Sequence, residues 1–350
     1  MTDFGYCHAR IRGMKSRLLD EEFFERLLAA RELSEITSAL DETDYSQDIH
    51  DGLLRLSGAG GVEEGLRLNL AATFQEVIGF LDGKAKKLIE LLLERWDIQN
   101  IKTVLRGQHV GASPEEIVRS FVPAGALAES TLVALTKEPD IKAAIDLMAT
   151  WNIRHSRPLT RNFPAYVTTQ TLAALEVALD QDYYASALAE LHGRSFNVNL
   201  VRDLITRQID FSNIMILLRL AGEDQAKQAG DFFIDGGREI DRKTFDALAR
   251  ERETSDIITG LIDTGYYEQL LQGLERYQAE HSFASLERSL EEQAIKKTVG
   301  LFRAEPLSLA CVIAYLWAKV NEIMNVRIVL RAKEARMPAP AIREALVVIS

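Results

Sequence analysis

The feature that most constrains this chain is a ten-residue pattern that occurs three times. It reads acidic, apolar, any residue, Asn, β-branched, two variable positions, apolar, Leu, Arg, and it occupies residues 97–106, 210–219 and 322–331. The spacing of the asparagines is nearly constant, with 213 − 100 = 113 and 325 − 213 = 112, so three such repeats account for nearly all of the 350 residues. A period of this length predicts that each repeat forms one similar structural unit.

Apolar residues also recur at fixed positions around each asparagine. In the first repeat they are Leu88, Leu91, Ile98, Ile101 and Leu105, and equivalent apolar residues stand in the other two repeats. This spacing predicts one long amphipathic helix per repeat, with its apolar stripe buried against partner helices.

The polar residues of the pattern are the candidate site residues. Asparagine is a mediocre helix former, so its recurrence predicts a polar contact inside or beside each core. The acidic residue three positions earlier and the arginine six later should lie near the same polar edge. We interpret the set as fold-determining helix contacts rather than a ligand site, because one copy stands in every repeat: Asp97, Asn100, Arg106, Asp210, Asn213, Arg219, Glu322, Asn325 and Arg331.

Patterning elsewhere predicts an all-α fold. Helical periodicity dominates, for example over residues 23–40, and no run of alternating strands is evident. Ser113-Pro114-Glu115-Glu116 has the composition of a helix start. We therefore predict three similar helical units of about 112 residues, at 1–115, 116–228 and 229–350. Three equal units favour a pseudo-threefold ring or funnel, although a linear row would also satisfy the repeat.

Charge and hydropathy limit the kinds of partner that the chain can be expected to bind. A formal net charge of −11 repels phosphate backbones, so nucleic acid is not an expected partner. The segment from Met1 to Tyr6 lacks the pattern of a secretory signal, and the apolar stretch 307–318 is shorter than the ~20 residues that span a bilayer. We expect a cytoplasmic protein without a lipid anchor, whose membrane association is indirect.

Motifs for catalysis are lacking. The six histidines are scattered, the two cysteines have no metal-ligand spacing, and no phosphate-binding loop of the G-x-x-x-x-G-K-[ST] type occurs. Gly58-Ala59-Gly60-Gly61 lacks the third glycine of a dinucleotide-binding motif and is predicted to be a flexible loop. We therefore expect no catalytic residues, cofactor or metal.

Two further segments carry predictions. Residues 232–237, Phe-Phe-Ile-Asp-Gly-Gly, are interpreted as a turn pinned by its phenylalanines, with a partner-contacting loop as the alternative. The apolar end of the chain, residues 345–350, is predicted to pack as an anchored tail.

These patterns together resemble a known family. The opening Phe4-x-Tyr6-x-x-Ala9-Arg10-x-Arg12-x-Met14, the triple helix pattern and Phe233-x-x-Gly236-Gly237-x-x-Ile240-Asp241 are similar to the C subunits of archaeal and bacterial V/A-type ATPases, which are related to the d subunit of the eukaryotic proton pump. The resemblance covers essentially the whole chain.

The resemblance implies a non-catalytic role in a rotary machine. It implies a funnel of three helical units, present once per complex at the cytoplasmic face of the membrane. The central rotor stalk, made of D- and F-type subunits, would seat in the funnel, and the base would rest on the proteolipid ring. The chain would couple the two for ion-transport-linked ATP synthesis or hydrolysis. The alternatives from other classes are a cytoplasmic helical protein-binding scaffold without a rotary role, and a helical enzyme with an unrecognised site.

Overall fold

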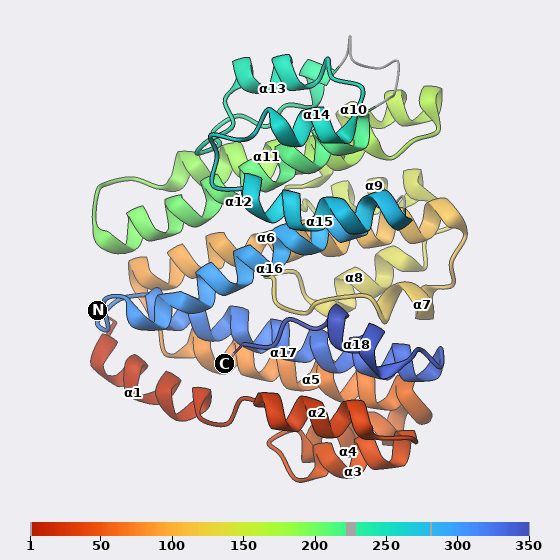
Figure 1. Ribbon diagram of the computed structural model, residues 1–350, viewed down its shortest axis with the longest axis vertical. Helices are drawn as coiled ribbons and strands as arrows, with labels where there is room; N and C mark the ends of the chain where they lie inside the picture. The colour runs from red at the N-terminus through yellow and green to blue at the C-terminus, as the bar shows by residue number, and fades with distance from the viewer. Residues whose placement is uncertain (1, 222–228, 281, 350) are drawn as a thin grey trace. The chain divides into compact units, whose positions relative to one another are not determined.

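The predicted all-α class is confirmed by a computed structural model that describes residues 2–221, 229–280 and 282–349. Across these ranges the chain forms eighteen α-helices and two short 3-10 helices, and no strand (Figure 1). None of the helices in the same ranges combines the length and hydropathy that crossing a bilayer requires.

The helices follow one another with short connections. The first nine are α1 (Phe4–Lys15), α2 (Glu21–Ala29), α3 (Leu33–Asp41), α4 (Ser46–Arg55), α5 (Gly58–Gly79), α6 (Gly83–Val110), α7 (Pro114–Val118), α8 (Glu129–Thr136) and α9 (Ile141–Thr150). The remainder are α10 (Ser156–Thr169), α11 (Ala173–Glu190), α12 (Phe196–Leu220), η2 (Ala229–Phe232), α13 (Arg242–Leu248), α14 (Thr254–Thr259), α15 (Tyr267–Glu280), α16 (Ala284–Val299), η3 (Gly300–Arg303), α17 (Ala310–Glu334) and α18 (Ala339–Ala345).

The helices group into two compact units. Unit 1 comprises Met1–Glu90, Val118–Ala126 and Ile295–Ser350, and unit 2 comprises Leu91–Ile117 and Leu127–Ala294. The two ends of the chain therefore belong to the same unit. The three-part division expected from the repeat stays a prediction.

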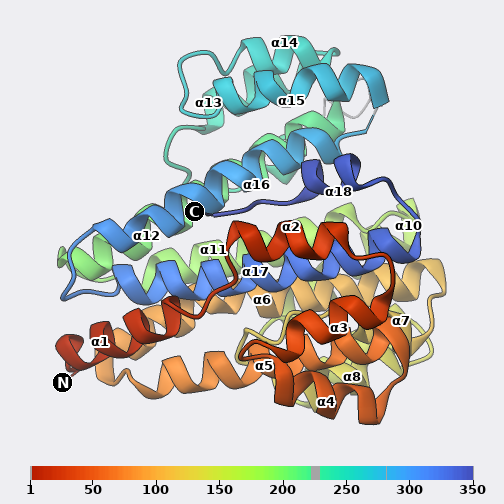
Figure 2. The same cartoon turned by 60° about the horizontal axis from the view of Figure 1, so that its bottom comes forward.

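The three long helices predicted from the repeat are present as α6, α12 and α17. Their apolar stripe is buried, as Leu88, Ile101 and Leu105 illustrate in α6. In unit 1, α17 packs against α1, α2 and α5, and Figure 2 shows it running between these N-terminal helices. In unit 2, α12 contributes to a core that also includes η2 and α13 to α16.

The glycine-rich segment at 58–61 is not the flexible loop that the sequence predicts. It forms the first turn of α5, which packs along α4. A Cβ atom on Gly61 would stand 2.2 Å from the carbonyl oxygen of Leu56, and one on Gly52 of α4 would stand 2.2 Å from the carbonyl oxygen of Gly61. These glycines therefore allow the backbones of α4 and α5 to approach closely.

Candidate functional site

The predicted signature residues have polar partners among backbone groups, tyrosine hydroxyls and charged side chains. No group of three or more His, Cys, Asp or Glu side chains within residues 2–221, 229–280 and 282–349 has a metal-binding arrangement. Cys7 and Cys311 are buried free thiols, and burial raises the pKa of both. We therefore describe the signature residues as the candidate site.

The asparagines bind the backbone of a segment that follows their helix. The Asn213 amide donates to the Ile234 carbonyl oxygen at 2.8 Å and accepts from the Ile234 N–H at 2.9 Å. Asn325 makes the same pair of bonds with Val347, at 2.8 and 3.1 Å. Asn213 and Asn325 thus make a polar contact of the kind that the sequence predicts, and Asn100 is equally buried.

These hydrogen bonds also test the predictions for the turn at residues 232–237 and the tail at residues 345–350. Phe233 is buried and its ring centroid lies 5.2 Å from that of Phe245, so the turn at 232–237 is pinned by Phe233 together with the Ile234 backbone. Val347 is buried and is held by Asn325, so the tail is anchored over its described residues, 345–349.

The acidic signature residues bind the backbone just ahead of a short helix. Asp97 accepts from the Leu127 N–H at 2.9 Å, two residues before α8 begins. Asp210 accepts from the N–H groups of Glu239 and Ile240 at 2.9 and 3.0 Å, just before α13.

Glu322 makes the corresponding contact with the start of the chain. Its carboxylate accepts from the Leu19 N–H, which lies two residues before α2 begins. The partner of each acidic residue is therefore the start of a short helix: α8 for the first, α13 for the second and α2 for the third.

A buried tyrosine completes two of these contacts. The Tyr266 hydroxyl donates to Asp210 at 3.0 Å, and the Tyr45 hydroxyl donates to Glu322 at 2.5 Å. Burial is the main cause that raises the pKa of both tyrosines, so each hydroxyl stays protonated as a donor. Burial also raises the pKa of Asp210, against the opposing effect of its backbone and Tyr266 hydrogen bonds.

The arginines form ion pairs with glutamates on other helices. Arg106 pairs with Glu176 of α11 through two bonds of 2.6 and 2.7 Å. Arg219 pairs with Glu287 of α16 at 3.3 Å.

The third arginine repeats this arrangement in unit 1. Arg331 pairs with Glu63 of α5 through bonds of 2.6 and 3.2 Å. The hydrogen bond to the glutamate raises the pKa of Arg106 and of Arg331.

The three glutamates are a fourth recurring position that the sequence reasoning missed. Each precedes the asparagine of its own repeat by a nearly constant offset, with 100 − 63 = 37, 213 − 176 = 37 and 325 − 287 = 38. The sequence carries a pattern that could have revealed this position: an apolar residue, Glu, two variable positions and a second apolar residue. The pattern occurs at Val62 to Leu66, Leu175 to Leu179 and Leu286 to Leu290.

A further polar residue acts eight positions after the asparagine. Gln108 donates to the carbonyl oxygens of Leu135 and Glu138 at the end of α8, at 3.0 and 3.3 Å. Lys333 donates to the carbonyl oxygens of Leu28 and Ala30 at the end of α2, at 2.5 and 2.7 Å. Both side chains satisfy carbonyl groups that a helix C-terminus leaves without an intrahelical partner.

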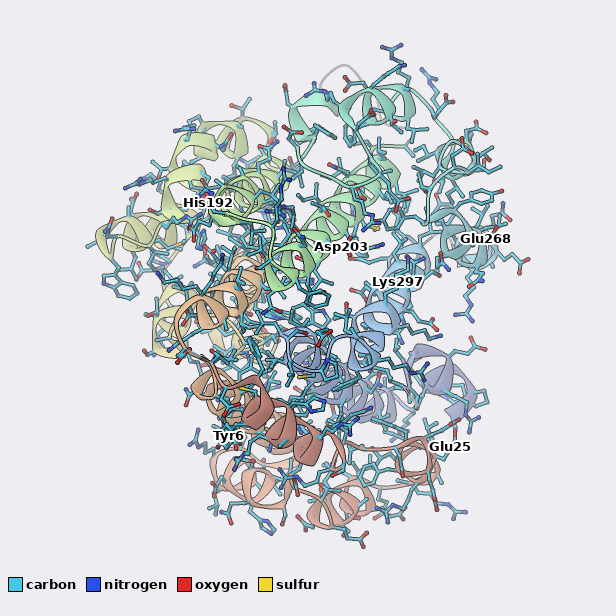
Figure 3. The ribbon with its side chains drawn as sticks, turned by 90° about the vertical axis from the view of Figure 1, so that its left-hand side faces the viewer. Tyr6, Glu25, His192, Asp203, Glu268 and Lys297 are labelled. Carbon is cyan, nitrogen blue, oxygen red and sulfur yellow. The ribbon has the colours of Figure 1, made fainter. Side chains whose placement is uncertain are left out.

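We call these sets of contacts joints. The first joint links α6 to α8 and α11, the second links α12 to α13 and α16, and the third links α17 to α2 and α5. The first two lie in unit 2, and the third lies in unit 1. An exposed ion pair adds to the third joint: Glu25 of α2, which is labelled in Figure 3, pairs with Arg343 of α18.

These features define a protein that is helical throughout its described elements and whose recurrent polar residues act between helices. A family model described as ATP synthase (C/AC39) subunit matches residues 7–345. The chain belongs to this family.

Curated relatives match over nearly their full length. The C subunit of the A-type ATP synthase of Methanococcoides burtonii is 30% identical over 349 residues, covering 99% of this chain and 95% of the relative. That of Methanosarcina acetivorans is 30% identical over 353 residues, covering 99% and 94%. That of Methanocaldococcus jannaschii is 23% identical, covering 99% and 87%.

Proposed function

We propose that this chain is the non-catalytic central-stalk subunit of a rotary V/A-type ATPase, where it couples the rotor shaft to the membrane proteolipid ring. The observation that carries the proposal is the full-length match to relatives that are C subunits of A-type ATP synthases. The signature residues support it, because their partners are backbone groups and carboxylates of the same chain.

The joints support a closed arrangement of the three repeats. Each signature helix contacts the backbone just ahead of a short helix in another repeat. The short helix is α8 of the second repeat for α6, α13 of the third repeat for α12, and α2 of the first repeat for α17. We propose three units, at 1–115, 116–228 and 229–350, in a pseudo-threefold funnel that receives the stalk. A linear row would leave the polar groups of α17 without such partners.

The proposed partners follow from this role. D- and F-type stalk subunits would seat in the funnel, and the proteolipid ring would meet its base at the cytoplasmic face of the membrane. One copy per complex suffices for a part on the rotation axis.

The test is an affinity pull-down of a tagged copy from gently solubilised native membranes, followed by quantitative mass spectrometry. Recovery of proteolipid and stalk subunits in constant ratio to the tagged chain is the expected result. A control chain carrying the tag alone should recover neither. Recovery of this protein without them, while the ATPase stays intact in the extract, contradicts the rotary role and favours the scaffold alternative.

A further inference from the structure

The third joint differs from the second in how the chain supports it. Asp210 and Ile240 are 240 − 210 = 30 residues apart, so the segment between α12 and α13 keeps them near each other. Glu322 and Leu19 are 303 residues apart. No short segment ties them together, so the third joint is held closed by non-covalent contacts alone: the packing of α17 on α1, α2 and α5 and the polar contacts of its signature residues.

The N-terminal segment nevertheless carries the same local elements as the second joint. The sequence offset from Leu19 to Tyr45 equals that from Ile240 to Tyr266, since 45 − 19 = 26 and 266 − 240 = 26. Two residues before each tyrosine stands a threonine, whose hydroxyl accepts the tyrosine N–H.

The threonines and the helix starts also correspond. Thr43 and Thr264 each donate to a leucine carbonyl three residues earlier, at 2.6 and 2.7 Å. Both α2 and α13 are preceded by an N-cap aspartate, Asp20 or Asp241, whose side chain accepts from the N–H three residues later. The start of α2 therefore stands against α17 as the start of α13 stands against α12.

The third joint also contains a buried cation. Lys319 donates to the Tyr45 hydroxyl at 2.7 Å and to Glu322 at 3.1 Å, and its ammonium lies 3.9 Å from the centre of the Tyr45 ring. The equivalent position in α12 is Arg207, which pairs with Asp203 and keeps 29% of its side chain exposed. Lys319 and Glu322 are only 5% and 4% exposed.

We propose that Tyr45, Lys319 and Glu322 form a clasp that holds the first repeat on the last signature helix and closes the chain. Because the joint lacks a short covalent link, load that crosses from the third repeat to the first passes through these contacts together with the packing of α17 on α1, α2 and α5. The inference rests on the function proposed above in so far as the load is rotor torque. Lys333 and Arg343 extend the clasp along α2, through helix-end carbonyls and Glu25.

The first experiment is hydrogen–deuterium exchange on the full chain, comparing Tyr45→Phe with its matched control Tyr266→Phe. Each change removes one hydroxyl donor from a buried carboxylate. Tyr45→Phe should speed exchange across residues 19–45 by about tenfold or more, since a buried hydrogen bond to a charged group is lost. Tyr266→Phe should leave residues 19–45 unchanged. Unchanged exchange in Tyr45→Phe, or equal loosening of residues 19–45 by Tyr266→Phe, overturns the clasp.

A second variant tests the clasp at a different residue, in case neighbouring groups compensate for the lost Tyr45 hydroxyl. Lys319→Met removes the cation and keeps an apolar side chain of similar length. Increased exchange across residues 19–45 supports the clasp, and unchanged exchange in this variant overturns the part of Lys319 in it.

The second experiment measures coupling in assembled complexes. Complexes containing wild type, Tyr45→Phe or Tyr266→Phe are matched for incorporated chain, and ions pumped per ATP hydrolysed are measured. A ratio lowered in Tyr45→Phe alone supports load transfer through the clasp, and equal ratios overturn it. Failure of the wild-type chain to incorporate would refute the rotary role itself, while the exchange result on the isolated protein still decides the clasp.

Discussion

Replacing Asn213 by leucine tests the polar contact that the recurring asparagine makes with the backbone of Ile234. Leucine has a similar volume, but it can neither donate to the Ile234 carbonyl nor accept from the Ile234 N–H. Both groups would remain buried without this partner, at a cost of about 1–3 kcal/mol each, so the free energy of unfolding should fall by about 2–6 kcal/mol.

A control on the same helix separates this effect from helix propensity. Asn199 is exposed on α12, so Asn199→Leu should change the free energy of unfolding by less than about 1 kcal/mol. Asn213→Asp should cost at least as much as Asn213→Leu, because it buries a carboxyl group and sets one of its oxygens against the Ile234 carbonyl oxygen. Urea denaturation followed by circular dichroism measures all three. A cost below about 0.5 kcal/mol for Asn213→Leu would show that the amide is not what holds the turn at 232–237.

Three other predictions concern unit 1. Gly65→Ala should destabilise the protein by about 1–3 kcal/mol, because its Cβ would stand 2.6 Å from a backbone oxygen of α4. Gly79→Ala, with open space around it, should be neutral or stabilise by up to about 1 kcal/mol. Equal thermal midpoints for the two variants would contradict this prediction. A double-mutant cycle on Arg331 and Glu63 should give a coupling of only about 0.5–1 kcal/mol at low salt, since half of the arginine is exposed, and a salt-independent value would contradict it. Burial lowers the pKa of Lys319, so between its folded and unfolded pKa values the unfolded chain binds more protons than the folded chain. The free energy of unfolding of the wild type should therefore rise with pH, relative to Lys319→Met, through that alkaline window. Denaturation at several pH values measures the difference, and a constant or falling difference would refute the reasoning.

The sequence was most informative about the long helices. An apolar stripe with the helical period shows which face is buried, and a polar residue at the same register in three repeats stands out against it. That is why α6, α12 and α17 and the burial of Asn100, Asn213 and Asn325 could be predicted.

The partners of those residues could not be read in the same way. A periodic pattern places Glu322 near the polar edge of its helix, but in the structure it is buried, and the N–H it accepts from belongs to Leu19, 303 residues away. Glu63 illustrates a second limit: a single glutamate in a helix is unremarkable until the three repeats are aligned on their asparagines.

Local composition also misled at two places. Gly58-Ala59-Gly60-Gly61 has loop composition, yet α5 needs small residues there because α4 lies against it. The helical pattern of residues 23–40 is interrupted at 30–32, between α2 and α3, without a glycine or proline. The backbone carbonyl of Ala30 is instead bound by Lys333, a contact that only the folded chain reveals.

The central claim is that this chain couples the rotor shaft to the ring, and reconstitution with and without it tests the claim most directly. Complexes lacking the chain should hydrolyse ATP without pumping ions, and adding the purified protein in a one-to-one ratio should restore pumping. Pumping that is equal in the presence and absence of the chain would contradict the account.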